Sequence, residues 1–120
     1  MAIPNDYREI VHKLLSRTDQ GEVKWGKTFH ASTFEVQISP GTKFQIWSGF
    51  DENTDLGFVA FSLNTLDGER LDNWAVDDGE NGYDFMIKLY QTAKRSAHNV
   101  GETLDGILAR LNEASPIGRS

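Results

Sequence analysis

Hydrophobic positions recur at helical spacing near the start of the chain and in its last third, and they alternate with polar positions in between. The segment that follows Pro4 predicts a helix, which Asn5 or Asp6 can cap and which ends before Gly21. The predicted buried face of this helix consists of Tyr7, Ile10, Val11, Leu14 and Leu15. The following stretch, residues 22–32, has no clear period, and Trp25 is expected to anchor this connection.

The last third of the chain carries two helical stripes that do not form one continuous face. Asn99 is a favourable N-cap residue, and Glu102 follows three positions later, as in a capping box. We therefore expect two helices with a bend at His98–Asn99. The first stripe consists of Met86, Leu89, Ala93 and Ala97, and the second consists of Val100, Leu104, Ile107, Leu108 and Leu111.

Two alternating segments, residues 33–38 and 43–50, flank the turn sequence Ser-Pro-Gly-Thr and predict a first hairpin. Partners across a hairpin point to the same face of the sheet, so a two-residue loop would mix the faces. We therefore expect an odd-length loop centred on Gly41. In that register Ile38 opposes Phe44, and Val36 opposes Ile46.

A second hairpin is predicted around Asp67–Gly68, the preferred pair for a two-residue type I′ turn. This turn would pair Leu66 with Glu69, Leu63 with Asp72, Phe61 with Trp74 and Val59 with Val76. The predicted core face of the hairpin then consists of Val59, Phe61, Leu63, Trp74 and Val76. The opposite face collects Phe58, Ala60, Leu71 and Ala75, and the same parity places Trp47 there.

These elements predict an α+β fold made of a helix, a four-stranded antiparallel β-meander and two C-terminal helices packed on one sheet face. Residues 1–113 are expected to form a single domain, and residues 114–120 a flexible C-terminal tail. A chain of 120 residues can bury enough surface to fold without a metal or a disulfide.

The composition restricts the classes of function. The chain contains no Cys, which excludes disulfides, thiolate zinc sites and a Cys nucleophile. Its formal net charge of −6 disfavours nucleic acid as a partner. The basic turn formed by Lys94, Arg95 and His98 is better explained as a solvated helix end. No segment is typical of a signal peptide or a membrane span, so a cytoplasmic location and no membrane association are expected.

Two acidic segments are candidates for holding a cation. Asp51, Asn53 and Asp55 alternate as in the opening of a calcium loop, but Leu56 and Ser62 stand where an EF-hand needs Gly and Glu. The second segment offers Asp77, Asp78 and Asp84, and acids there also suit a helix N-terminus. Polar turns explain both segments better. We therefore expect no metal and no cofactor.

The predicted back of the sheet carries the largest functional signal. Trp47, Phe58 and Leu71 lie where a one-sided sheet should be polar. Either the segment from Trp25 to Phe29 folds over them, or they form a protein–protein surface, with a homodimer as one possibility. The sequence leaves these two interpretations open.

The segments "LLSRT…G…W" and "LYQTAKRSA…V…TLDGIL" resemble small bacterial open reading frames with an α-ββββ-αα pattern, over residues 14–111. This resemblance implies a bacterial source and a compact α+β domain, and it brings no activity. The sequence favours a non-catalytic interaction or regulatory module that acts on a protein partner or on itself. The alternative is a small ligand-binding or hydrolytic domain that uses the acidic segments 51–55 and 77–84.

Overall fold

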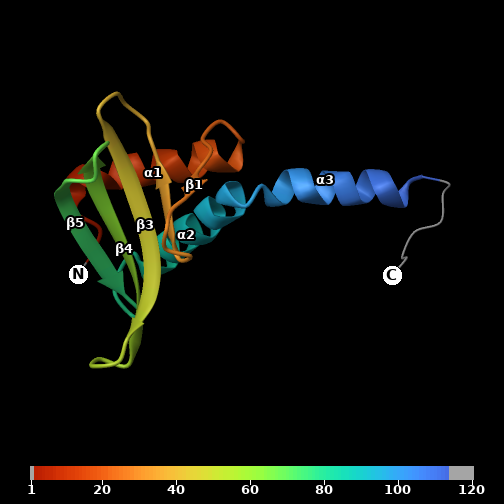
Figure 1. Ribbon diagram of the computed structural model, residues 1–120. Helices are drawn as coiled ribbons and strands as arrows, with labels where there is room; N and C mark the ends of the chain where they lie inside the picture. The colour runs from red at the N-terminus through yellow and green to blue at the C-terminus, as the bar shows by residue number, and fades with distance from the viewer. Residues whose placement is uncertain (1, 114–120) are drawn as a thin grey trace.

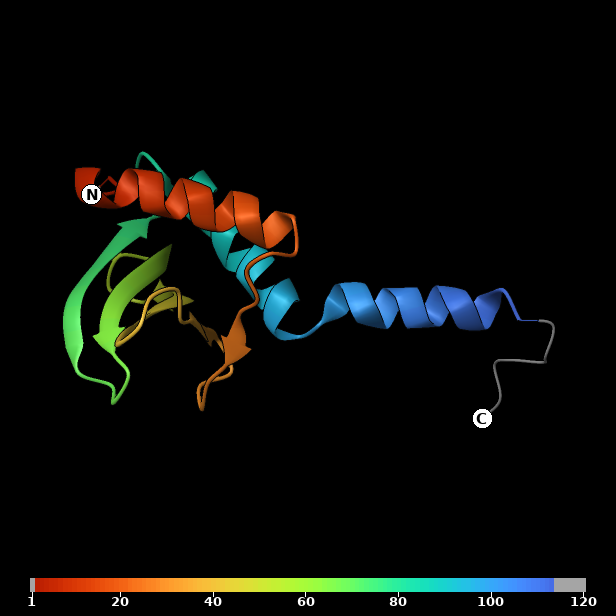
Figure 2. The ribbon, with the colours of Figure 1, turned by 90° about the horizontal axis from the view of Figure 1, so that it is seen from above.

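The computed structural model of the protein describes residues 2–113, so the predicted tail at 114–120 lies outside the described residues. Helices and strands form two layers: α1 and α2 cover one face of an antiparallel sheet, and α3 projects away from both layers (Figures 1 and 2). In chain order the elements are α1 (Asn5–Asp19), β1 (Gly26–Lys27), β2 (Thr33–Val36), β3 (Thr42–Asp51), β4 (Leu56–Thr65), β5 (Arg70–Asp77), α2 (Tyr83–Ala97) and α3 (Val100–Leu111).

The sheet confirms the predicted meander and adds one strand to it. The strands follow the order β1-β2-β3-β4-β5, and each pairs antiparallel with its neighbour. The strand that the sequence did not show is β1, in which Gly26 pairs with Glu35 and Lys27 with Phe34. A strand of two residues is too short to display an alternating pattern.

The hydrophobic core lies between the sheet and the first two helices. One row of side chains crosses this face of the sheet, from Phe34 through Ile46 and Phe61 to Trp74. From α1, the ring of Tyr7 contacts Phe61 and Trp74 edge-on, with ring centroids 6.0 and 5.5 Å apart. The predicted pairing of Phe61 with Trp74 and of Val59 with Val76 is thus confirmed.

The turn between β4 and β5 differs from the predicted type I′ turn. A type I′ turn needs positive φ at both central residues, whereas only Gly68 has it, with φ +99°. The Thr65 amide donates to the Glu69 carbonyl at 2.8 Å, and the Gly68 amide donates to the Thr65 carbonyl at 3.1 Å. The loop therefore contains three residues, Leu66 to Gly68, and the predicted pairing of Leu66 with Glu69 is wrong.

A β-bulge in β5 restores the predicted register after this turn. Leu63 pairs with Asp72, but the next residue, Asn64, pairs with Arg70. Leu71 is therefore the extra residue, and it shares the position opposite Asn64 with Arg70. The prediction placed Leu71 alone at this position, so the bulge is what brings Arg70 onto this part of the sheet.

The connection between β2 and β3 shifts the predicted register by two residues. Phe44 pairs with Val36, not with Ile38 as predicted, and Ile46 pairs with Phe34. Gly41 has φ +85°, and the Thr42 amide donates to the Ser39 carbonyl at 3.5 Å, as in a type II turn with Pro before Gly. A shift of two keeps every side chain on its predicted face. Ile38, however, lies in the connection and is 53% exposed.

The predicted bend at His98–Asn99 is confirmed, but its mechanism differs from the predicted capping box. Asn99 makes no side-chain cap bond to α3. Its φ is +53°, and its amide donates to the Ser96 carbonyl at 3.1 Å, so Asn99 ends α2 in the left-handed conformation. Asn is one of the few residues that adopt this conformation readily, which explains its place here.

The third helix does not pack on the sheet, and this part of the fold prediction is wrong. None of its twelve residues is buried, and among the described elements α3 contacts α2 alone. At its root the Lys24 Nζ lies 3.9 Å from the Glu102 Oε1. The amphipathic pattern of a helix predicts that its stripe is buried, but it does not identify the surface that covers it.

Candidate interaction surface

The face of the sheet that the helices leave uncovered is here called the back surface, and Figure 1 shows it from the front. Because side chains alternate along a strand, the residues next to the core row point to this side. The described chain thus has one face of the sheet buried under helices and the other open. The back surface consists of Thr33 and Glu35 on β2, Lys43, Gln45 and Trp47 on β3, Phe58, Ala60, Ser62 and Asn64 on β4, and Arg70, Leu71, Asn73 and Ala75 on β5.

Trp47 and Arg70 form the centre of the back surface. The guanidinium carbon of Arg70 lies 5.1 Å from the centroid of the half-buried Trp47 ring, within the range of a cation–π contact. Trp47 pairs with Ala60 and Arg70 pairs with Asn64, so Ser62 lies between their two partners on β4. The contact therefore shelters Ser62 and Asn64, which are both buried although no helix covers them.

A network of polar side chains lies beside this pair. The Glu35 Oε1 accepts a hydrogen bond from the Gln45 Nε2 at 3.1 Å and lies 3.3 Å from the Lys43 Nζ. The Asn64 Nδ2 donates to the Ser62 Oγ at 3.2 Å, whereas the Asn64 Oδ1 has no partner among the described residues. These contacts restrict the conformations of the side chains that make them.

The other end of the back surface is apolar. The ring of Phe58 lies over Gly49, its partner on β3, so closely that a Cβ at Gly49 would stand 2.8 Å from the Phe58 Cζ. A side chain at position 49 would therefore displace the ring. Phe58 extends the apolar area around Trp47 toward this end, whereas Leu71, which is 52% exposed, lies beside Arg70 at the bulge.

Neither aromatic ring of the segment from Trp25 to Phe29 covers Trp47. Trp25 is buried in the core on the helix side, where its Nε1 donates to the Thr18 Oγ1 at 3.0 Å. Phe29 is fully exposed, at the edge of a cavity of about 460 Å³ that reaches Lys43 and Gln45 on the back surface. The interpretation that this segment folds over Trp47 is therefore wrong for the rings of Trp25 and Phe29.

The acidic segment 51–55 forms a tight turn at the tip of the β3–β4 hairpin. The Asp51 Oδ1 accepts a hydrogen bond from the Asn53 amide at 2.9 Å. The Asp55 amide donates to the Asp51 carbonyl at 2.8 Å, and Asp55 has φ +59°. Asp51 and Asp55, two of the three candidate cation ligands in this segment, therefore shape the turn itself.

The acidic segment 77–84 connects β5 to α2 at the same end of the sheet. The Asp78 amide donates to the Gly57 carbonyl at 2.8 Å, and the Asp77 amide donates to the Glu80 Oε1 at 2.7 Å. Burial raises the pKa of Tyr83, and the charges of Asp78 and Asp84 raise it further. Among residues 2–113, no group of three or more His, Asp or Glu side chains has an arrangement that could hold a metal ion.

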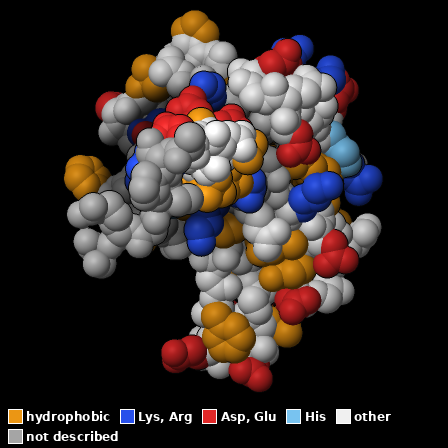
Figure 3. All heavy atoms as spheres, turned by 90° about the vertical axis from the view of Figure 1, so that its right-hand side faces the viewer, with side chains coloured by type: hydrophobic (Ala, Val, Ile, Leu, Met, Phe, Trp, Pro, Cys, Tyr) orange, Lys and Arg blue, Asp and Glu red, His pale blue; other side chains and the backbone are white. Residues whose placement is uncertain are grey.

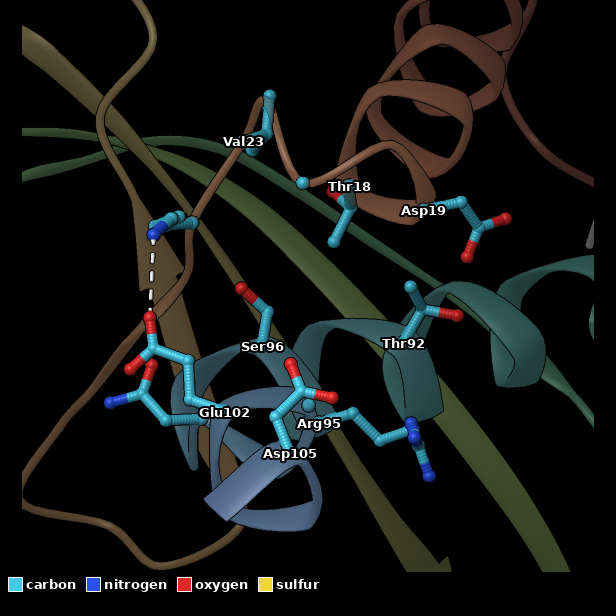
Figure 4. Close-up of a pocket in the computed structure, with 12 residues that line it drawn as sticks. Thr18, Asp19, Val23, Thr92, Arg95, Ser96, Glu102 and Asp105 are labelled. Carbon is cyan, nitrogen blue, oxygen red and sulfur yellow. Dashed lines mark ion pairs between the residues drawn. The ribbon is translucent and has the colours of Figure 1, made fainter. Parts of the chain in front are cut away.

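The basic turn at the end of α2 borders a cavity of about 490 Å³ at the root of α3 (Figure 4). Arg95 lines this cavity together with Asp19, Glu102 and Asp105, so positive and negative groups are mixed there. The ring of His98 stands edge-on to Phe34, with centroids 5.6 Å apart. The structure therefore places Arg95 at a cavity of mixed charge and His98 against a core ring.

Comparisons of the chain with protein-family models, with curated proteins and with solved structures found no match. Within the described residues, no helix is long and apolar enough to cross a membrane. The candidate site therefore depends on the geometry of the back surface. Sequence reasoning found Trp47, Phe58 and Leu71, and the parity of β3 could also have indicated Lys43. It missed Arg70, because no sequence signal marks the bulge.

Proposed function

We propose that the protein is a non-catalytic interaction module that binds a protein partner through the back surface. The observation that supports this function is the contact of Arg70 with the half-buried ring of Trp47 at the centre of that surface. Trp and Arg dominate the binding energy of protein interfaces, especially where polar groups surround them. The network around Glu35 supplies such a polar rim.

The free donors of Arg70 indicate the chemistry of the partner. Among the described residues the Arg70 guanidinium has no carboxylate partner, whereas the nearby Lys43 is neutralised by Glu35. A guanidinium binds a carboxylate through two parallel hydrogen bonds. The partner is therefore a protein segment in which an apolar side chain, which packs on Trp47 and Phe58, neighbours an acidic residue, which binds Arg70.

A random peptide library displayed on phage tests this function with the purified full-length protein as bait. Peptides that carry an acidic residue beside an apolar one should be enriched on the parent protein but not on Trp47→Ala. Arg70→Glu should remove the preference for acidic residues. Leu66→Ala is the control, because Leu66 is an exposed apolar residue in the β4–β5 turn, outside the back surface.

Two results would count against the proposal. Enrichment of no peptide above the level on Trp47→Ala would show that the back surface is not a docking surface. Enrichment of peptides whose binding is unchanged by Trp47→Ala and by Arg70→Glu would place the docking surface elsewhere. Self-association of the parent that Trp47→Ala abolishes would assign this surface to a second copy of the chain, as in the homodimer that the sequence left open.

A further inference from the structure

The third helix exposes an apolar stripe that no part of the described chain covers. Leu104 and Ile107 are each 51% exposed, and Leu108 and Leu111 are each 58% exposed. Figure 3, which views the molecule from the side toward which α3 projects, shows hydrophobic side chains emerging among charged groups. An isolated helix shorter than about 12–15 residues is marginal in water. Gly101 and Gly106 each weaken it by about 1 kcal/mol relative to Ala. The helix therefore needs a surface to pack on.

An apolar groove on the same molecule also stands open. It has a volume of about 260 Å³ and lies between α1, the segment before β1 and the β2–β3 connection. Its apolar wall consists of Ile10, Leu14, Val23, Ile38 and Phe44. Ile10 is 39% exposed and Ile38 is 53% exposed, although the hydrophobic pattern predicts that both are buried. Both the groove and the α3 stripe therefore expose apolar side chains that the hydrophobic pattern predicts to be buried.

We propose that α3 of one copy docks in this groove of a second copy, and that the exchange is reciprocal. The stripe at Leu104, Leu108 and Leu111 has the spacing with which an amphipathic helix anchors in an apolar groove. Reciprocal exchange closes a two-fold symmetric dimer and makes the contact twice. This doubling matters because specific interfaces bury roughly 1,200–2,000 Å², and one face of a short helix is small on that scale.

Charges beside the two surfaces support their pairing. Lys13 and Arg17 stand at the rim of the groove one helical turn apart, and Asp105, three residues before Leu108, lies at the edge of the stripe. Within one copy Lys13 pairs with Glu9 at 2.8 Å, and Arg17 pairs with Glu22 at 3.4 Å. These side chains are largely exposed, and such pairs contribute about 0–1 kcal/mol, so docking can exchange them.

The root of α3 favours a groove on a second copy over the groove of its own chain. Only His98 and Asn99 separate α2 from α3, and Asn99 already has the left-handed conformation that directs α3 away from the body. Val23 borders both the root cavity and the groove. To enter its own groove, α3 would have to reverse at Asn99. Exchange between copies keeps the conformation of Asn99.

Sedimentation equilibrium of the full-length chain tests this dimer. We expect the parent to be a dimer that dissociates on dilution. We expect Leu104→Asp with Leu108→Asp, called here the helix variant, and Ile38→Asp, called the groove variant, each to raise the dissociation constant at least tenfold. Leu66→Asp is the matched control, because Leu66 is 49% exposed on the β4–β5 turn, outside both surfaces. It should leave the dimer unchanged.

A mixture of the two variants separates exchange from other kinds of pairing. The groove variant retains an intact helix and the helix variant retains an intact groove, so one contact can form between them. The mixture should associate more tightly than either variant alone. A parent that stays monomeric at every concentration overturns the proposal, and so does formation of an open series of larger species. A groove variant that dimerises as well as the parent also overturns it, because the helices would then pair with each other.

Disulfide trapping gives a second measurement that does not depend on the groove variant. The chain contains no Cys, so Ile38→Cys and Leu108→Cys introduce the only thiols. Mixed single variants should form a cross-linked species of twice the chain mass more readily than Leu108→Cys alone. In a chain with both substitutions, an intramolecular disulfide alone would assign α3 to its own groove and overturn the exchange. The dimer uses neither Trp47 nor Arg70, so its failure would leave the proposed function standing.

Discussion

The Arg70 guanidinium carbon lies 5.1 Å from the centre of the Trp47 ring, although the two residues belong to strands that β4 separates. The three-residue turn at Leu66 to Gly68 and the bulge at Leu71 place Arg70 opposite Asn64. The long side chain then crosses β4 above the buried Ser62. This contact spans three strands and covers the middle of the back surface, on which no helix packs.

The two tryptophans of the hairpin strands should differ strongly in their contribution to stability. Trp74 is buried against Tyr7 and Phe61, so Trp74→Ala should lower the free energy of unfolding by about 3–5 kcal/mol. Trp47 is only partly buried, so Trp47→Ala should cost about 1–2 kcal/mol through lost area and the lost cation–π contact. Equilibrium unfolding in urea, followed by circular dichroism, measures both values.

Arg70→Ala is the control for the Trp47 variant. It removes the cation–π contact but leaves the Trp47 ring in place, so it should cost less than Trp47→Ala. A Trp47→Ala protein that fails to fold would show that Trp47 is a core residue. In that case the back surface would serve stability and not binding.

Tyr7 should make the protein sensitive to alkaline pH. Burial raises the pKa of Tyr7 from 10.0 to about 12, and the hydrogen bond from its Oη to the Asp72 Oδ2 at 2.9 Å adds to this shift. The folded state then holds the phenolic proton more tightly than the unfolded state. The stabilisation is fully present below about pH 10, and it is lost as the pH rises toward about 12.

Tyr7→Phe tests this dependence. The variant should lose about 1 kcal/mol of stability at neutral pH, because the hydrogen bond to Asp72 disappears. Its free energy of unfolding should then fall less steeply than that of the parent between about pH 10 and 12, as urea unfolding at several pH values measures. Burial also raises the pKa of Tyr90, so Tyr90→Phe is a matched comparison. An unchanged slope in Tyr7→Phe would contradict the assignment.

Divalent cations should leave the stability unchanged. The acidic segments 51–55 and 77–84 form turns, and within residues 2–113 they assemble no group suited to a metal ion. A cation that bound only the folded state would add about 2.7 kcal/mol at one hundred times its dissociation constant. A rise of several degrees in the melting temperature with Ca²⁺ or Mg²⁺ would be the opposite result. Asp51→Asn should abolish such a rise if that turn holds the ion.

Reversing the charge of the basic turn should not change any affinity for nucleic acid. Lys94→Glu with Arg95→Glu should fold normally, because both side chains are exposed. The chain has a net charge of −6, and Arg95 lines a cavity that Asp19 and Glu102 share. Electrophoretic mobility of short DNA and RNA duplexes measures the affinity. Salt-dependent binding by the parent that the double variant abolishes would show that the turn contacts phosphates.

The sequence was sufficient to predict the faces of the sheet, because the alternation of apolar residues fixes parity. Phe61 faces Trp74 as predicted, and Trp47 lies on the opposite side. The details that depend on backbone conformation were not predictable in this way. Asp67–Gly68 suits a two-residue or a three-residue loop, and Pro40–Gly41 forms a type II turn that leaves Ile38 outside the ladder.

The same limit applies to the candidate site and to α3. The alternating pattern indicated Trp47 and Phe58, but the contact of Trp47 with Arg70 depends on a bulge that no residue type announces. The hydrophobic stripe of α3 predicts that one face of the helix is buried. Packing depends on two surfaces, and the pattern of one helix identifies only one of them. The sequence therefore could not show that α3 makes no contact with the sheet of its own chain.

Photo-cross-linking in cells that produce the protein tests most directly whether the back surface is a docking surface. Benzoylphenylalanine replaces Leu71 on the back surface or, in the control, Leu66 on the β4–β5 turn, which are 52% and 49% exposed. We expect an adduct with another protein at position 71, its loss when Trp47→Ala is added, and no such adduct at position 66. An adduct at neither position, or one that Trp47→Ala leaves unchanged, would contradict the account.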